Sequence, residues 1–307
     1  MSGRKDPTLL ERYSDAADAS SATVIAHYST SFGAAARLLD AEARRRIRSI
    51  YALVRVADEI VDGAAAEAGL APAELLEVLD GLEAETEQAI ARGYSANLVV
   101  HAFAAVARET GFGAELTRPF FASMRRDLDP APFAPEEIGP YIHGSAEVVG
   151  LMCLATFLAG ERAAATGSGT ASATVDPDRR ARLERGAVHL GAAFQKINFL
   201  RDLAVDWRTL GRNYFPGVDP DAFTEADKSA ILDDIDHDLA IAGESLPDLP
   251  RRARSAVAAA HGLFASLSAR CRATPAAEII ATRIRVPDGE KLAIAVRSAL
   301  VTGGSRR

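Results

Sequence analysis

Hydrophobic positions recur with a helical period along almost the whole chain. Apolar residues return every three or four positions in ten segments, and no run alternates apolar and polar residues as a half-buried strand would. The segments are residues 19–39, 40–62, 72–93, 96–111, 114–127, 135–160, 179–210, 225–244, 250–272 and 276–300. Asp40, Ser95 and Thr224 stand where helix N-caps are expected, and glycines such as Gly63 and Gly111 follow helix ends. The pattern predicts an all-α fold.

The same pattern suggests the domain organisation. We interpret residues 1–18 as an N-terminal extension, residues 19–300 as one helical domain and residues 301–307 as a disordered tail. Residues 163–178 are small, polar and rich in Gly, Ser and Thr, which predicts a flexible loop. The Gly-Ser-Gly in this loop follows no predicted strand and lacks the third glycine of a dinucleotide fingerprint, so we expect no nucleotide there.

One predicted helix is apolar on nearly every side and yet carries a charged stripe. In YALVRVADEIVD, residues 51–62, the positions of Tyr51, Arg55, Asp58 and Asp62 are i, i+4, i+7 and i+11, which is one line along a helix. Burying ionised carboxylates costs on the order of several kcal/mol unless they are paired or bound to a metal. The stripe therefore needs partners from elsewhere in the chain.

The helix predicted over residues 179–210 supplies a matching stripe. Gln195, Asn198, Asp202 and Asp206 fall at i, i+3, i+7 and i+11 of an otherwise apolar run. A single D-x-x-x-D on a helix is usually a solvated pair, but two of them on apolar helices with Arg and amide neighbours point to a shared site. We expect the two stripes to face each other across an interior cavity with four carboxylates.

Oxygen ligands without a nearby His or Cys favour a hard cation. The carboxylates and the amide of Asn198 predict Mg²⁺, with Mn²⁺ as the alternative. Because Mg²⁺ typically bridges carboxylates to phosphates, the expected ligand is a diphosphate. Arg55, Arg201 and Arg212 would bind its oxygens through their planar guanidinium groups.

Composition narrows the partners and the compartment. The 307 residues carry a formal net charge of -7, so no nucleic-acid partner is expected. An arginine cluster could meet a phosphate or a lipid surface, although a solvated helix face is the simpler interpretation; its members are Arg44, Arg45, Arg46 and Arg48. Cys153 and Cys271 have no metal-type spacing and are expected to be reduced. The apolar run 148–159 is too short to span a bilayer, and we expect a cytoplasmic chain.

At these motifs the chain resembles the squalene/phytoene synthase family, the head-to-head prenyl transferases. DEIVD and NFLRDLAVD resemble the two Asp-rich motifs of the family, and YSTSF (28–32), FQKINFLRD (194–202) and GRNYFP (211–216) resemble its other signatures. The similarity spans roughly residues 20–295. The resemblance implies a single-domain helical bundle of the isoprenoid synthase type, with a central active-site cavity and prenyl diphosphate substrates.

The resemblance also implies roles for individual residues. The implied Mg²⁺ ligands are Asp58, Asp62, Asn198, Asp202 and Asp206. The implied catalytic residues are the four aspartates, Arg55 and Tyr141. The implied substrate contacts are Tyr28, Ser29, Thr30, Ser31, Phe32, Tyr51, Arg55, Gln195, Asn198, Arg201, Arg212 and Tyr214. Candidate aromatic walls for carbocations are Phe32, Phe194, Phe199 and Tyr141, for each of which ordinary packing is an equally good explanation. Glu147 departs from the small residue of the family, and it either adds charge beside the cavity or faces away.

Three functions compete. A phytoene synthase would join two geranylgeranyl diphosphates through a cyclopropyl diphosphate, whereas a squalene or dehydrosqualene synthase would join two farnesyl diphosphates and need NADPH only for squalene. A non-catalytic assembly protein of the same fold is disfavoured by the four aspartates. The small residues 33–36 would leave room for the longer tail, unless they only allow close helix packing. No obligate protein partner is inferred, and peripheral association with the inner face of the membrane for product release is left open.

Overall fold

The structure is a computed structural model that describes residues 6–29, 36–166, 175–205, 207, 212–281 and 284–303. This described part contains helices and no strand, which confirms the all-α prediction. Half of the predicted loop 163–178, residues 167–174, lies outside the described residues. The predicted bounds of the loop are wrong at both ends, because one helix continues to Thr166 and the next begins at Pro177. The tail predicted over 301–307 is partly wrong, because the last helix continues to Gly303.

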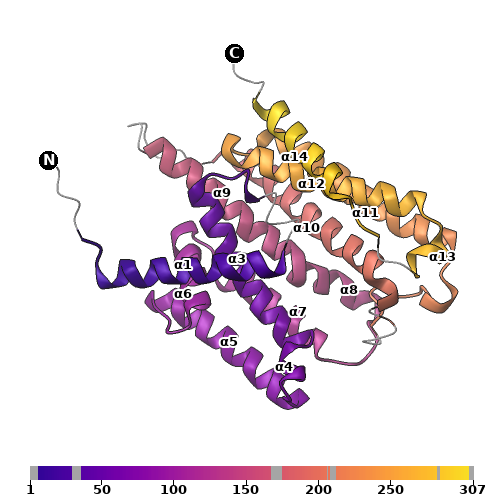
Figure 1. The fold of residues 1–307 in the computed structure, drawn as a ribbon, viewed down its shortest axis with the longest axis horizontal. Helices are drawn as coiled ribbons and strands as arrows, with labels where there is room; N and C mark the ends of the chain where they lie inside the picture. Colours follow the sequence, from indigo (N-terminus) through magenta and orange to yellow (C-terminus); the bar gives the residue numbers. More distant parts are fainter. Residues whose placement is uncertain are drawn as a thin grey trace.

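The N-terminal helices form one half of the molecule, at the lower left of Figure 1. They are α1 (Leu9–Tyr28), α3 (Ala41–Val61), α4 (Ala64–Glu67), α5 (Pro72–Arg92), α6 (Leu98–Thr110) and α7 (Ala114–Asp127). The prediction of a helix over 19–39 is wrong at both ends. Thr8 caps the N-terminus of α1 in a capping box with Glu11, so most of the supposed extension is helical and packs on α3 and α6.

A nearly continuous helical stretch crosses the middle of the molecule. It consists of α8 (Pro135–Ile142), the π-helix η1 (His143–Glu147) and α9 (Val148–Thr166). The part Pro135–Glu161 has the length and mean hydropathy, 1.5, of a membrane span, and 44% of its most apolar window is buried inside the fold. A core helix of a soluble protein has the same properties, and α9 contacts α3, α6, α7 and α10. The stretch is therefore weak evidence for a membrane span.

The C-terminal helices form the other half, shown in orange to yellow in Figure 1 apart from α10. They are α10 (Pro177–Val205), η3 (Pro220–Ala222), α11 (Glu225–Ser245), η4 (Leu246–Asp248), α12 (Arg251–Ala273), α13 (Ala276–Ile279) and α14 (Asp288–Gly303). The single helix predicted over 276–300 is wrong, because α13 ends at Ile279 and a new helix begins after Pro287. A proline disfavours helical backbone at the residue before it, which explains the break.

Two of the three predicted N-caps are confirmed. Asp40 accepts a hydrogen bond from the Ala43 amide at 2.8 Å, and Thr224 forms a capping box with Asp227. Ser95 is not the N-cap of α6. This helix begins at Leu98, and the side chain of Asn97 accepts hydrogen bonds from the amides of Val99 and Val100 at its N-terminus.

Separate apolar clusters hold the two helices that carry the acidic stripes. Ile50, Leu53 and Ala57, on the face of α3 opposite its stripe, are at most 1% exposed and pack with residues of α6, α7 and α9. Ile197 and Leu200 of α10 are fully buried against α11 and α12. The apolar faces thus orient both helices and leave their polar stripes outside the clusters.

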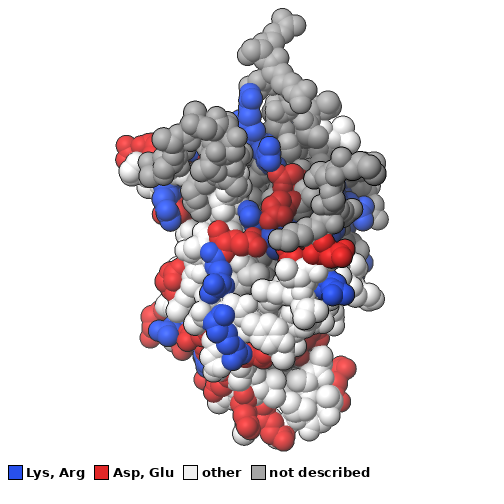
Figure 2. Space-filling model, turned by 90° about the vertical axis from the view of Figure 1, so that its left-hand side faces the viewer, with Lys and Arg blue, Asp and Glu red and all other residues white. Residues whose placement is uncertain are grey.

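Basic and acidic side chains are interspersed on the face shown in Figure 2. Acidic groups gather at its lower end, the end at which Figure 1 places α4 and α5. The described part of this face has no continuous basic surface of the kind that binds nucleic acid.

Candidate active site

The stripe on α3 meets the C-terminal end of α1. The Arg55 guanidinium donates to Asp58 Oδ2 from Nη1 at 2.6 Å, and it also pairs with Glu59. The same group lies 4.5 Å from the centre of the Tyr28 ring, a cation–π distance. Tyr51, one turn earlier, interacts with Ser29. The structure therefore brings together the predicted residues of the first acidic motif and two residues of YSTSF.

The stripe on α10 is arranged in the same way. Arg201 forms a bidentate pair with Asp202, with Nη2 at 2.6 Å from Oδ2 and Nε at 3.1 Å from Oδ1. Gln195 and Asn198 are half-buried, and the side-chain amide of neither forms a hydrogen bond with another described residue. Their amides are free to bind a ligand. Four predicted site residues lie outside the described residues: Thr30, Ser31, Phe32 and Asp206.

Arg212 connects the segment after α10 to the end of α3. Its Nη1 donates to Asp62 Oδ1 at 2.9 Å, across 150 positions of sequence, and its Nη2 donates to the Asp127 carbonyl oxygen at 2.6 Å. The Tyr214 hydroxyl lies 3.5 Å from Nη1. Arg212 and Tyr214 of GRNYFP therefore lie close to Asp62 of the first acidic motif, and Asp127 lies beside them.

Asp127 is the site residue that sequence reasoning missed. Asp127 is 8% exposed, and its carboxylate accepts a hydrogen bond of 2.7 Å from the Tyr141 hydroxyl. Burial raises the pKa of Asp127 to about 7, and Arg212 and Tyr141 limit the rise. An acid in the last turn of a helix, here α7, faces the negative end of the helix dipole. That unfavourable position was a usable signal, but in RRDLD the acid reads as one of several solvated charges.

Aromatic rings line this part of the site. The Phe199 and Tyr214 rings stack at 4.0 Å between centroids, and Tyr141 stacks on Tyr214 at 5.5 Å. All three residues are buried. Phe194 is not part of the group, because its ring stacks on Phe264 of α12 at 3.6 Å. Of the predicted aromatic walls, the structure therefore groups Phe199 and Tyr141 and separates Phe194.

Close packing of η1 fixes the position of Tyr141. A side chain on Gly191 of α10 would place its Cβ 2.7 Å from the carbonyl oxygen of Ala146, and one on Gly144 would meet the backbone of Pro119. Only glycine permits these approaches. The Ser123 hydroxyl donates to the Tyr141 carbonyl oxygen at 3.0 Å, which satisfies a backbone group next to the π-helix.

Glu147 pairs with a neighbour on the same π-helix. Its Oε2 lies 2.8 Å from Nδ1 of His143, whose side chain is 46% exposed. The carboxylate is thus directed to an exposed imidazole and not to a residue of the two acidic stripes. Of the two alternatives for this departure from the family pattern, the structure favours the one in which Glu147 adds no charge to the site.

The acidic groups crowd one another at the end of α3. Burial and the neighbouring Asp62 raise the pKa of Asp58 to about 7. A cation would relieve this repulsion, and the donors available are oxygens, so the residues fit Mg²⁺. Among the described residues, however, no three His, Cys, Asp or Glu side chains are grouped as metal ligands. The three described motif aspartates instead each pair with an arginine.

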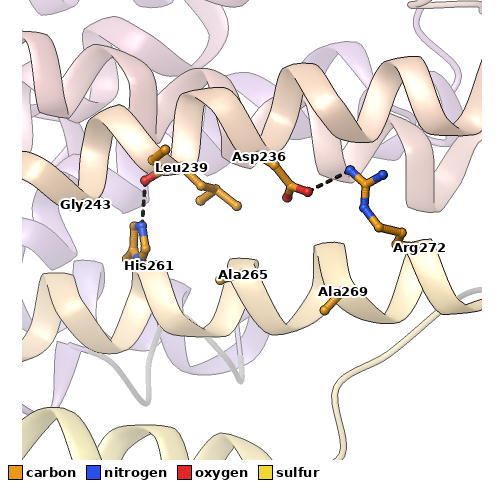
Figure 3. A pocket seen from close by; sticks show the side chains of 8 residues that line it. Asp236, Leu239, Gly243, His261, Ala265, Ala269 and Arg272 are labelled. Carbon is orange, nitrogen blue, oxygen red and sulfur yellow. Dashed lines mark hydrogen bonds and ion pairs between the residues drawn. The ribbon is translucent and has the colours of Figure 1, made fainter.

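A cavity of about 410 Å³ lies elsewhere, in the groove between α11 and α12 (Figure 3). Ala265 leaves space at its centre, and two polar contacts flank it. Nε2 of His261 lies 2.8 Å from the Leu239 carbonyl oxygen, and Arg272 donates to Asp236 at 2.7 Å. None of the residues lining it belongs to either acidic stripe, so this groove is not part of the candidate active site.

Solved structures that resemble this chain share its helical fold. A dehydrosqualene synthase in complex with a ligand has a TM-score of 0.74 and 18% identity, over 95% of this chain and 99% of that one. The squalene synthase HpnC of Alicyclobacillus acidocaldarius has a TM-score of 0.69 and 17% identity, over 85% and 94%. At these identities the likeness establishes the fold, which is the all-helical fold of squalene and dehydrosqualene synthases.

Sequence comparison identifies the family. The squalene/phytoene synthase family matches residues 25–290. A phytoene synthase of Mycobacterium bovis is 27% identical over 259 residues, 78% of this chain and 76% of the relative. A phytoene synthase of Arthrospira platensis is 30% identical over 216 residues, 66% and 63%. The chain belongs to the squalene/phytoene synthase family, whose members are prenyl transferases that act on prenyl diphosphates.

Proposed function

We propose that this protein is a phytoene synthase, which joins two geranylgeranyl diphosphates head to head through prephytoene diphosphate, a cyclopropyl intermediate. The observation that carries the proposal is the set of Arg–Asp pairs on α3, on α10 and between Arg212 and Asp62. These pairs support the proposal, because a metal-bound diphosphate requires carboxylates for the cation and arginines for the phosphate oxygens.

The residues that would hold Mg²⁺ are Asp58, Asp62, Asn198, Asp202 and Asp206. Bound there, the ion supplies Lewis-acid stabilisation of the departing diphosphate. Once the aspartates bind a cation, Arg55, Arg201 and Arg212 can turn from them to the phosphate oxygens, to which a guanidinium donates two parallel hydrogen bonds. These guanidinium groups would then help to neutralise the diphosphate as it leaves the allylic substrate.

The buried aromatic group would protect the carbocations. Tyr141, Phe199 and Tyr214 stack on one another and are buried, which excludes water. Aromatic rings stabilise a nearby positive charge without forming a bond to it. Asp127 accepts the hydrogen bond of the Tyr141 hydroxyl and so fixes the orientation of that ring. In this proposal Asp127 is a positioning residue.

The preference for the twenty-carbon substrate rests on small side chains near Ala36. Ala36 is 5% exposed and packs with Leu39, Ile47 and two alanines of α12, Ala253 and Ala256. Half-buried side chains from α9 border the same cluster. An apolar tail could extend toward this region, and each additional buried methylene contributes about 0.8 kcal/mol. The names of the sequence relatives favour the same assignment.

Condensation of two farnesyl diphosphates is the second candidate, because the structural neighbours are named dehydrosqualene and squalene synthases. The deciding experiment incubates the protein with farnesyl and geranylgeranyl diphosphate separately, with Mg²⁺ and with or without NADPH, and identifies the extracted hydrocarbon. We expect phytoene from geranylgeranyl diphosphate without NADPH. Squalene or dehydrosqualene as the main product would establish the second candidate.

A further inference from the structure

The arginine cluster near the start of α3 divides into two kinds of side chain. Arg44 donates from Nε to the Ala36 carbonyl oxygen at 3.2 Å and from Nη2 to the Leu39 carbonyl oxygen at 2.8 Å. Arg45 and Arg46 both pair with Glu109, at 2.7 and 3.0 Å. The guanidinium groups of these three arginines already bind carbonyl oxygens or a carboxylate of the protein. We therefore do not expect them to bind a phosphate or a lipid surface.

Arg48 is different. The residue is half-buried, and its guanidinium forms no hydrogen bond or ion pair with any residue that the structure describes. No nitrogen of its guanidinium is among the buried side-chain atoms without a partner, so the group is accessible to a ligand. Among the described residues, the Arg48 guanidinium thus has no anionic partner and can bind an anionic ligand.

The position of Arg48 is on the polar stripe of α3. It precedes Tyr51 by three residues and Arg55 by seven, so the three side chains leave the same side of the helix. At 1.5 Å per residue, Arg48 and Arg55 are roughly 10 Å apart along the axis. The turn before Arg48 contacts Ala36 through Arg44, and the turn after it contacts Ser29 through Tyr51. Arg48 therefore lies between the turn of α3 that contacts Ala36 and the turn that contacts Ser29.

The other arginines of the site are already engaged with acids. Arg55 pairs with Asp58 and Glu59, Arg201 with Asp202, and Arg212 with Asp62. The reaction proposed above needs two diphosphates in the cavity at once, and each is a multiply charged anion. One of them can use the metal and the engaged arginines, whereas the other needs a cation that the aspartates do not neutralise.

We propose that Arg48 binds the diphosphate of the second prenyl substrate, the one that is not held by the acidic motifs. This inference rests on the proposed function, because only a reaction between two prenyl diphosphates requires two anion sites. Arg48 would act together with Tyr51 and Ser29. The planar guanidinium would bind two phosphate oxygens at once, which a lysine cannot reproduce.

The test is calorimetric titration with geranylgeranyl thiodiphosphate, an analogue that ionises slowly, in the presence of Mg²⁺. We expect the wild-type protein to bind two molecules. We expect Arg48→Ala to bind the first with unchanged affinity and the second at least about tenfold more weakly, because a charge-assisted contact is lost. Arg48→Lys should recover part of the loss, and Arg185→Ala, which removes an exposed arginine of α10, should match the wild type.

The outcomes separate this inference from the proposed function. A wild-type protein that binds no analogue with Mg²⁺ present contradicts both. A wild-type protein that binds two molecules, with both affinities unchanged in Arg48→Ala, removes the role of Arg48 and leaves the proposed function standing. If Arg48→Ala fails to fold by circular dichroism, Arg48→Gln, which keeps most of the side-chain length, is titrated in its place under the same criteria.

Discussion

The two ends of α3 differ in what surrounds them. At the C-terminal end, Asp58 pairs with Arg55 of the same helix, and Arg212 from a distant part of the chain donates to Asp62 at 2.9 Å. At the N-terminal end, Ile47 lies in an apolar cluster with Ala36 and two alanines of α12. The C-terminal end of α3 therefore belongs to the charged part of the candidate site, and its N-terminal end packs in an apolar cluster that contains several alanines. Substitutions can alter the two ends separately.

The charged end is costly for the fold alone. Asp62 caps the C-terminus of α3 and Asp127 lies in the last turn of α7, so both acids face the negative ends of helix dipoles. Arg212 connects the two helix ends through Asp62 and the Asp127 carbonyl. An arrangement that is unfavourable for stability but held by specific contacts is the pattern expected of a functional site. The apolar end has no comparable conflict.

The largest expected effect comes from removing a carboxylate at the charged end. Asp58→Asn and Asp202→Asn should each lower turnover by about a thousandfold or more, because a ligand of the proposed metal and a partner of an arginine are lost together. Melting temperature should be unchanged or higher, since a partly buried acid has been neutralised. The measurement is hydrocarbon formation from geranylgeranyl diphosphate with Mg²⁺.

Asp178→Asn is the matched control, because it makes the same change at an exposed position of α10 and should leave turnover at the wild-type level. Retained activity in both Asp58→Asn and Asp202→Asn would show that the acidic stripes are not the catalytic centre.

A smaller effect is expected from the hydroxyl of Tyr141. Tyr141→Phe keeps the ring stack but deprives Asp127 of the hydrogen bond at 2.7 Å, so stability should fall by about 1–3 kcal/mol. Turnover should fall on the order of tenfold to a hundredfold as the ring loses its fixed orientation. Tyr214→Phe, whose hydroxyl is 3.5 Å from Arg212, should cost less on both measurements. Equal losses in the two variants would contradict a special role for the Tyr141–Asp127 pair.

At the apolar end the expected change is in preference, not in rate. Ala36→Phe should shift the ratio of kcat/KM for geranylgeranyl over farnesyl diphosphate by about tenfold toward farnesyl diphosphate, if the added ring shortens the space for the tail. The alternative is that Ala36 only permits close packing against α12, and then the ring should destabilise by about 1–3 kcal/mol without a change in preference. Competition between the two substrates, together with thermal unfolding, distinguishes the two.

The helices themselves were predictable because their periodicity and caps are local properties. The segments 40–62, 72–93 and 114–127 match α3, α5 and α7 to within a residue at each end. The wrong helix boundaries are those for which a local signal in the sequence was not used. The capping box at Thr8 starts α1 ten residues before the predicted helix, and Pro287 separates α14 from α13 within the segment predicted as one helix.

The site was predictable only in part, for a similar reason. Both acidic stripes follow from residue spacing along single helices, and the structure confirms the Arg–Asp neighbours within each stripe. Asp127 could not be found in this way, since its partners Tyr141 and Arg212 lie 14 and 85 positions away and meet it only in the tertiary fold. Spacing also could not show that Phe194 faces Phe264, away from the other rings.

The smallest effect expected is a dependence of stability on pH at the charged end, measured without metal. The pKa of Asp127 is about 7 in the folded protein and about 3.9 in an unfolded chain. Between these values the native state keeps a proton that the unfolded state has released, so the free energy of unfolding falls as pH rises from about 4 to about 7 and is flat on either side. Because Asp127 is almost fully buried, the fall should approach about 1.4 kcal/mol per pH unit.

The variant Asp127→Asn tests this expectation, because it cannot titrate, while its amide oxygen can still accept a hydrogen bond from Tyr141. In urea unfolding at pH 5 and pH 7 with EDTA, the wild type should therefore lose on the order of 2 kcal/mol more than the variant. Asp178→Asn should follow the wild type. If the wild type and Asp127→Asn lose stability in parallel, Asp127 is not the protonated group, and the pH dependence belongs to Asp58, whose pKa is raised by the same burial at the other side of Asp62.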